Sequence, residues 1–199
     1  MATRKSVEDK AIDAALRLAA KRGWRSLALA DIAKAARVPL ADLSQKFHSK
    51  ADILTAFSRR IDGVVLKGLD EELLGEPARD RVFDVLMARF DALAPYKLAL
   101  KAICDDLGRD PFAALALTPS ALQSLAWMLE AAGIDSSGLR GAVRVRGLAL
   151  IWAAAFRVWL DDEDGGLAPT MAELDRRLRQ AESLIEKVRG QRKDSAGAS

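Results

Sequence analysis

Few residues of this sequence have the types and spacing that catalysis or metal binding requires. The 199-residue chain has one histidine, His48, and one cysteine, Cys104, so neither a multi-histidine metal site nor an internal disulfide can form. Carboxylates cluster at Asp105–Asp106 and Asp161–Asp164, where they could hold a divalent cation, although such runs are more often solvated loops. Glycine-rich phosphate loops and HExxH motifs are absent from the sequence. We therefore expect no enzymatic activity, no metal and no cofactor.

Basic side chains are concentrated at the start of the chain. The first 60 residues contain 13 Lys and Arg against 6 Asp and Glu, a net charge of +7, whereas the remainder has a net charge of −4. A basic module on a mildly acidic body suggests that the module meets a polyanion. The alternative is a solvated surface with a chance excess of basic side chains.

The helices predicted over this basic segment explain how it could meet DNA. Ser6 as N-cap and Gly23 as a stop bound a first helix over 7–22. Two short helices follow, Leu29–Ala36 and Leu40–Phe47, separated by three residues. This pair is typical of a helix-turn-helix, in which the second helix lies in the major groove of DNA.

The apolar residues of this pair have the spacing of a small core, which leaves the polar residues facing outward. We expect phosphate contacts from Lys34, Arg37 and Lys46. Gln45 is the best candidate for contacting a base, because its amide can pair bidentately with adenine. Leu40 begins the second helix, and His48 lies beside it, where a phosphate or water contact is expected rather than catalysis.

Residues 11–57 resemble the N-terminal domain of the TetR family of bacterial regulators. The resemblance rests on the Lys-Arg-Gly-Trp end of the first helix and on Asp31-Ile32-Ala33, Ala36, Val38, Leu43, Phe47 and Ser49-Lys50. It implies an all-α, TetR-like fold of about nine helices and a phosphate contact from Lys50. The expected domains are a helix-turn-helix domain over 1–49 and a helical ligand-binding and dimerisation domain over 50–189. A polar tail over 190–199 is expected to be disordered.

Five residues depart from the family pattern. Arg37 stands where the family usually has Gly, in a turn that tends to need positive φ. Leu27 and Ala28 replace a Thr or Ser cap, Asp42 replaces a small polar residue, and Ser44 replaces a phosphate-binding Tyr. Because Asp42 repels phosphates, these departures weaken the expected DNA-contact set.

The composition of the whole chain favours helices in the body as well. Ala and Leu number 37 and 29, against 22 β-branched residues, and no strand-like run is found. Helices are expected at about 50–74, 79–93, 95–107, 119–132, 138–161 and 169–189. The longest apolar run, Leu148–Phe156, is too short to span a bilayer, which takes about 20 residues. The charged N-terminus indicates no signal peptide, so we expect a cytoplasmic protein with no transmembrane segment.

The TetR resemblance also implies an effector pocket, a homodimer and double-stranded operator DNA as partners. The pocket for a small apolar ligand would be lined by Leu86, Phe90, Leu100, Ile103, Cys104, Leu122, Leu125, Trp152 and Phe156. The dimer interface would involve Trp159, Met171, Leu174, Leu178, Ala181 and Ile185. For both sets, ordinary packing within one chain is the alternative.

The C-terminal part is also similar to another group of proteins. Trp159-Leu160, Asp162, Thr170 and Leu174–Arg177 resemble the accessory lipid-binding proteins of coenzyme Q biosynthesis, which share the TetR-like fold. This resemblance implies a protein that binds apolar isoprenoid lipid and has little or no affinity for DNA. The sequence is therefore consistent with two functions, that of a DNA-binding repressor and that of a lipid-binding accessory protein.

Overall fold

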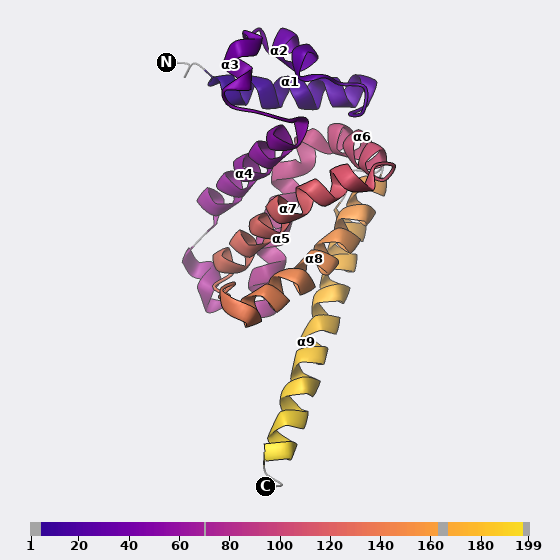
Figure 1. The fold of residues 1–199 in the computed structure, drawn as a ribbon. Helices are drawn as coiled ribbons and strands as arrows, with labels where there is room; N and C mark the ends of the chain where they lie inside the picture. Colours follow the sequence, from indigo (N-terminus) through magenta and orange to yellow (C-terminus); the bar gives the residue numbers. More distant parts are fainter. Residues whose placement is uncertain (1–4, 70, 163–166, 197–199) are drawn as a thin grey trace. The chain divides into compact units, whose positions relative to one another are not determined.

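The computed structural model is entirely helical over the residues that it describes, 5–69, 71–162 and 167–196. Its α-helices, drawn in Figure 1, are α1 (Val7–Arg22), α2 (Leu29–Ala36), α3 (Leu40–Ser44), α4 (Lys50–Gly68), α5 (Ala78–Leu93), α6 (Lys97–Leu107), α7 (Pro111–Ala131), α8 (Gly138–Asp161) and α9 (Ala168–Ala196). Short 3-10 helices at Glu71–Gly75 and Ala94–Tyr96 flank α5. The predicted helical class is confirmed.

The chain divides into two compact units. The N-terminal unit comprises Met1–Lys67 with Arg89–Ser124, and the C-terminal unit comprises Gly68–Ala88 with Leu125–Ser199. Within the N-terminal unit, α1 packs against α6. The expected domain boundary after residue 49 stays a prediction. In the C-terminal unit, α8 packs against α9 and buries Trp159 and Leu174.

Local signals explain the bounds of α1. The Ser6 hydroxyl accepts a hydrogen bond from the Asp9 N–H at 3.0 Å, which satisfies one of the free donors at the helix start. Gly23 ends the helix with φ 78°, a conformation that only glycine adopts readily, and its N–H donates to the Ala19 carbonyl. Both predicted bounds of α1 are therefore confirmed, as are those of α2.

Several other boundaries differ from the prediction. α3 ends at Ser44 instead of Phe47, and α4 ends at Gly68 instead of about Leu74. α7 begins at Pro111, so Pro119 lies inside a helix instead of at its start. α9 continues to Ala196 instead of ending at 189, so the helix extends into the expected polar tail.

α7 is the most apolar helix in the part of the chain that is described. It is long enough to cross a membrane by length and composition alone, with a mean hydropathy of 1.4 over a stretch of which 22% is buried. Its first half, residues 111–123, contains no charged side chain and no fully buried one. One such helix is weak evidence and does not indicate a membrane span.

Candidate nucleic-acid interface

The turn between α2 and α3 is fixed by a left-handed residue. Arg37 has φ 55° and ψ 45°, and it is the non-glycine residue with positive φ among those described. Its N–H donates to the Lys34 carbonyl, and the Val38 N–H donates to the Ala33 carbonyl at 3.1 Å. Pro39 then provides the N-cap of α3. The prediction that this turn needs a positive φ is confirmed. Arg37 adopts this conformation at a greater cost in energy than glycine would.

A small apolar core holds the three N-terminal helices together. Ile32, Ala33, Leu43 and Phe47 are buried, and α1 packs against both α2 and α3. The DNA-contact candidates of the same segment face solvent; the exposed ones are Lys34, Arg37, Leu40, Gln45, Lys46 and His48. The structure therefore brings six of the seven predicted contact residues onto the exposed surface of one helix-turn-helix.

The early end of α3 changes the setting of two predicted residues. Gln45 is the C-cap of α3, and Lys46 lies in the turn that follows. Ser44 is exposed, and its hydroxyl donates to the Ala41 carbonyl at 2.8 Å. Asp42 is also exposed, so its negative charge lies on the helix that would enter the groove.

The helix starts on either side of this unit are capped differently. At α2 the N-cap is Ala28, which has no side chain that can accept a hydrogen bond, although Asp31 accepts the Ala28 N–H at 3.0 Å. At α4 the capping box is complete, because Asp52 accepts the Ser49 N–H and the Ser49 hydroxyl accepts the Asp52 N–H. Asp52 also accepts the His48 N–H at 2.8 Å, which fixes the backbone directly after α3.

Lys50, the seventh predicted contact residue, is placed differently from the others. It is half-buried, and its ammonium donates to the Trp24 carbonyl at 2.9 Å. The same ammonium lies 5.3 Å from the centroid of the Trp24 ring. Burial lowers the pKa of Lys50, which a nearby carboxylate, Asp106, partly offsets. Lys50 is therefore engaged with the protein itself.

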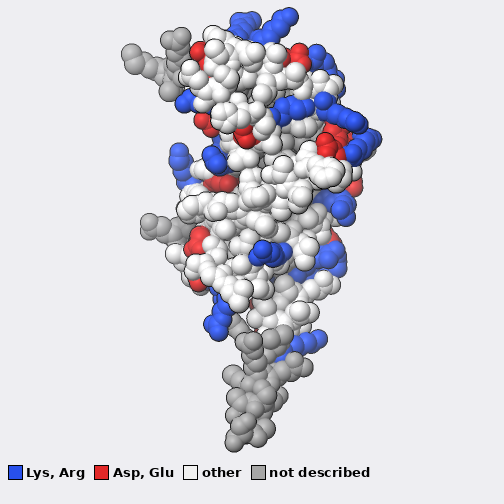
Figure 2. Space-filling view, in the orientation of Figure 1, with Lys and Arg blue, Asp and Glu red and all other residues white. Residues whose placement is uncertain are grey.

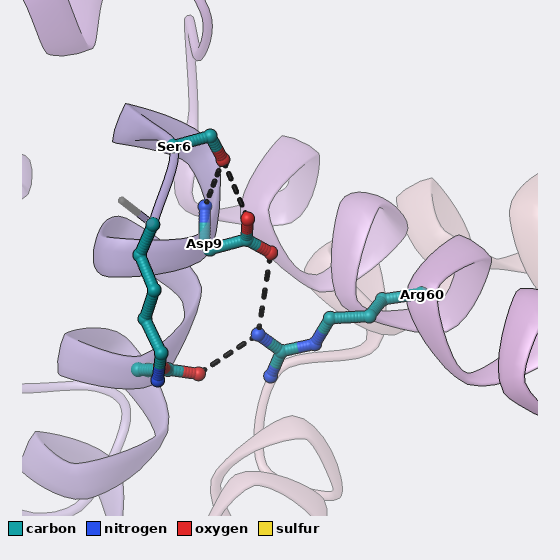
Figure 3. A network of polar contacts seen from close by, with 5 residues as sticks. Ser6, Asp9 and Arg60 are labelled. Carbon is teal, nitrogen blue, oxygen red and sulfur yellow. Dashed lines mark hydrogen bonds and ion pairs between the residues drawn. The ribbon is translucent and has the colours of Figure 1, made fainter. Parts of the chain in front are cut away.

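A polar network joins the start of α1 to α4 (Figure 3). The guanidinium of Arg60 on α4 lies 2.8 Å from Asp13 and 3.8 Å from Asp9, whose other oxygen accepts the Ser6 hydroxyl. Lys5 also contacts Asp13, at 2.7 Å. Burial favours the neutral form of Asp13, but the hydrogen bonds from Lys5 and Arg60 outweigh it and lower the pKa of that carboxyl. The network fixes α1 on α4.

Arg60 also borders a hollow that was not anticipated from the sequence. Its guanidinium stacks over the rings of Phe57 and Tyr96, at 5.7 and 5.6 Å from their centroids. The hollow, of about 510 Å³, is lined by Lys5, Asp9, Asp13, Arg60, Ile61, Val64, Asp91, Ala92, Pro95 and Tyr96. None of the predicted effector-pocket residues lines it.

The residues predicted to line an effector pocket are mostly core residues. Leu86, Phe90, Leu100, Ile103 and Leu125 are buried. The half-buried ones are Cys104, Leu122, Trp152 and Phe156. The Phe156 ring stacks between Trp152 and Trp159 on α8, at centroid distances of 5.5 and 5.4 Å. The pocket itself therefore stays a prediction.

The residues predicted for the dimer interface fall into two groups. Trp159, Leu174 and Leu178 are buried where α8 and α9 pack within one chain, which is the intrachain alternative. Met171 and Ile185 are exposed, and Ala181 is half-buried.

The second of the two carboxylate clusters is only partly described. Asp161 ends α8 and Asp162 is its C-cap, whereas Glu163 and Asp164 lie outside the described residues. In the first cluster, Asp106 is engaged by backbone N–H groups of another segment, at 2.7 and 2.8 Å. Within the described part of the chain, no group of three or more potential metal ligands comes together.

Basic side chains are visible on the surface of the helix-turn-helix. In Figure 2, Lys and Arg side chains project at the upper end of the view, over α2 and α3, with a few acidic side chains among them. A protein that neutralises DNA phosphates needs such exposed basic side chains. The exposed set, the buried core beneath it and the αL turn are together typical of a DNA-binding helix-turn-helix.

Comparison with known proteins identifies the family of this domain. Residues 11–57 match the model of the N-terminal domain of bacterial regulatory proteins of the tetR family. The N-terminal segment is thus similar to the N-terminal domain of tetR-family regulators, as the sequence resemblance implied. No curated protein matches the chain.

Solved structures agree on the fold. The TetR transcriptional regulator from Nitrosomonas europaea ATCC 19718 is similar with a TM-score of 0.68 and 23% identity, covering 89% of this chain and 99% of that one. A TetR transcriptional regulator from Rhodococcus sp. RHA1 gives a TM-score of 0.64 and 19% identity, covering 87% and 94%. At these identities the likeness concerns the fold, and the TetR-like fold is confirmed.

Proposed function

We propose that this protein is a dimeric, cytoplasmic transcriptional regulator, a repressor that binds operator DNA through α2 and α3. The observation that carries the proposal is the set of exposed contact candidates on one helix-turn-helix within the segment that matches the tetR family. Lys34, Arg37 and Lys46 contact phosphates, with His48 beside them. Gln45 and Leu40 face the bases, which fixes sequence preference.

A second copy of the chain supplies the second DNA-binding unit. The long helices of the C-terminal unit expose apolar side chains, which are Leu139, Val143, Leu150, Met171, Leu184 and Ile185. Exposed apolar side chains on two long helices favour burial against a partner. A two-fold dimer places two recognition helices about 34 Å apart, one turn of DNA.

A small apolar ligand in the helical body releases the DNA by changing this spacing. The proposal is supported by the predicted lining residues, which are buried and half-buried apolar side chains of α5 to α8. Cys104 in the helical body is a poor candidate for a catalytic nucleophile. Burial raises the pKa of the Cys104 thiol to about 11, so this sulfur is protonated and a poor nucleophile at neutral pH.

The test is a titration of the purified protein against labelled DNA from upstream of its own coding sequence, at moderate salt. A random fragment of equal length is the control. Specific binding that exceeds binding to the random fragment by at least about a thousandfold supports the proposal. Equal, weak binding to both fragments would refute it.

The exposed first half of α7 favours one alternative, a TetR-like lipid-binding accessory protein of ubiquinone biosynthesis. Phe112 is 84% exposed and Leu115 67% exposed, on a stretch without charge. Such a surface suits contact with lipid. Co-purification of isoprenoid lipid, detected by mass spectrometry, together with failure to bind the upstream DNA would establish the alternative.

A further inference from the structure

The segment that joins α1 to α2 is held by a carboxylate from a distant part of the chain. Asp106, in the last turn of α6, accepts the N–H groups of Trp24 and Arg25 on one oxygen, at 2.7 and 2.8 Å. The Arg25 N–H, with that of Trp24, lowers the pKa of Asp106. The carboxylate is therefore charged at neutral pH, and charge-assisted bonds of this type are about twice as strong as neutral ones.

The carbonyl groups of the same two residues are held by another helix. The Lys50 ammonium, at the start of α4, donates to the Trp24 carbonyl at 2.9 Å and to the Arg25 carbonyl at 3.4 Å. Asp106 and Lys50 thus bind the N–H and C=O groups of one dipeptide from two different helices. We call Asp106, Lys50 and the Trp24–Arg25 dipeptide the clamp.

Gly23 and the burial of the Trp24 side chain both support the clamp. A Cβ at Gly23 would lie 3.2 Å from the Asp106 carboxylate, in a backbone conformation of φ 78°. Glycine therefore leaves room for the carboxylate and makes the turn. The Trp24 side chain is 6% exposed, so the dipeptide is anchored in the core as well as held by the clamp.

We propose that the clamp positions the helix-turn-helix for DNA binding, with Asp106 and Lys50 as positioning residues. The proposal rests on the proposed DNA-binding function. α2 begins at Leu29, four residues after Arg25, so a fixed dipeptide fixes the start of the first helix of the motif. It also changes the role of Lys50, whose ammonium holds the protein backbone instead of a DNA phosphate.

The proposal is tested with two variants and one matched control. Asp106→Ala removes both hydrogen bonds, Asp106→Asn keeps an oxygen that can accept them, and Asp105→Ala removes the exposed carboxylate next to Asp106. Affinity for the upstream DNA fragment is measured at several salt concentrations, with circular dichroism to verify folding. Asp106→Ala is expected to weaken binding roughly tenfold with an unchanged salt slope, since no phosphate contact is lost. Asp106→Asn restores most of the affinity, and Asp105→Ala matches the wild type.

Lys50→Ala separates the clamp from a phosphate contact. The clamp predicts weaker binding with an unchanged salt slope, whereas loss of one phosphate contact lowers the slope by about 0.9. A lower slope for Lys50→Ala, or wild-type affinity for Asp106→Ala, would overturn the proposal while leaving the DNA-binding function intact. Failure of the wild type to bind the fragment would instead overturn that function, and the clamp's role with it.

Amide hydrogen exchange provides a second test of the clamp, which does not require Asp106→Ala to fold. In the wild type the Trp24 and Arg25 amides are expected to be protected, and in a folded Asp106→Asn variant they stay protected. Rapid exchange of these amides in the wild-type protein would show that the clamp does not form.

Discussion

Asp62 on α4 and Arg89 on α5 form an ion pair inside the N-terminal unit, with each side chain only 8% exposed. The Ser124 hydroxyl donates to the same Asp62 oxygen at 2.6 Å. Three helices, α4, α5 and α7, are therefore connected by one buried carboxylate. Because charges are costly to bury, each partner of this pair depends on the other.

Asp62→Ala is expected to lower the free energy of unfolding by about 3–5 kcal/mol, since it removes the carboxylate that pairs with the buried Arg89 guanidinium. Urea unfolding followed by circular dichroism measures the change. Asp84→Ala removes an exposed carboxylate from α5 and should change stability by no more than about 0.5 kcal/mol. Similar losses in both variants would contradict the importance of the buried pair.

The local features of the DNA-binding unit could be predicted from the sequence, because their causes are local. The Ser6 cap and the Gly23 stop each depend on a few adjacent residues, whereas the positive φ of Arg37 follows from the family resemblance. The start of α7 is also signalled locally, although the predicted helix begins at about residue 119. Asp110 accepts the Ala113 N–H and Pro111 follows it, which is the usual cap and first residue of a helix.

The pairs that hold the helices together could not be predicted in this way. Asp106 binds residues 81 and 82 positions earlier, and Asp62 binds Arg89 and Ser124, 27 and 62 positions later. Periodicity and capping signals carry no information about such partners. For the same reason, Leu174 and Leu178 could not be assigned to the intrachain core before the packing of α9 on α8 was known.

The uncapped start of α2 offers a stabilising substitution. Ala28 has the extended backbone of an N-cap, φ −104° and ψ 158°, and Asp31 already accepts its N–H. Ala28→Ser adds the missing acceptor and is expected to raise the free energy of unfolding by about 1 kcal/mol. Ala30→Ser makes the same change inside the helix, where it should cost up to about 0.7 kcal/mol. Equal effects of the two serines in thermal unfolding would show that no cap forms.

Arg37 carries backbone strain that glycine would relieve. Its left-handed conformation costs roughly 1–2 kcal/mol. Glycine would remove this cost, but part of the gain would be lost because glycine gives the unfolded chain more conformational freedom. Arg37→Gly is thus expected to stabilise the protein by about 0.5–1 kcal/mol and to weaken DNA binding. Arg37→Ala keeps the strain, so it should weaken DNA binding without the gain in stability. Thermal unfolding and DNA titration of both variants separate these effects, and stabilisation by Arg37→Ala would contradict the assigned strain.

The capping box at α4 makes the free energy of unfolding depend on pH. Burial alone would raise the pKa of Asp52, but the hydrogen bonds from the His48 and Ser49 N–H groups outweigh it, and the folded pKa is lowered. A lowered folded pKa means that the stabilisation is complete above the unfolded value of about 4 and is lost as the pH falls through the folded value. Unfolding measured between about pH 5 and 2 should show a shallower loss for Asp52→Asn than for the wild type. The nearby His48 side chain also favours the ionised form of this carboxylate. Parallel pH curves for the two proteins would rule out this contribution.

The exposed apolar side chains of α8 and α9 predict how the proposed dimer can be dissociated. Ile185 is 52% exposed, and burying such a side chain against a partner contributes about 1.5–3 kcal/mol per subunit. Ile185→Glu should therefore raise the dimer dissociation constant by at least about a hundredfold, which sedimentation velocity measures. Leu98→Glu makes a matched change at an exposed leucine of α6, 78% accessible, and should leave the dimer intact. Dissociation by Leu98→Glu but not by Ile185→Glu would place the dimer interface in the other unit.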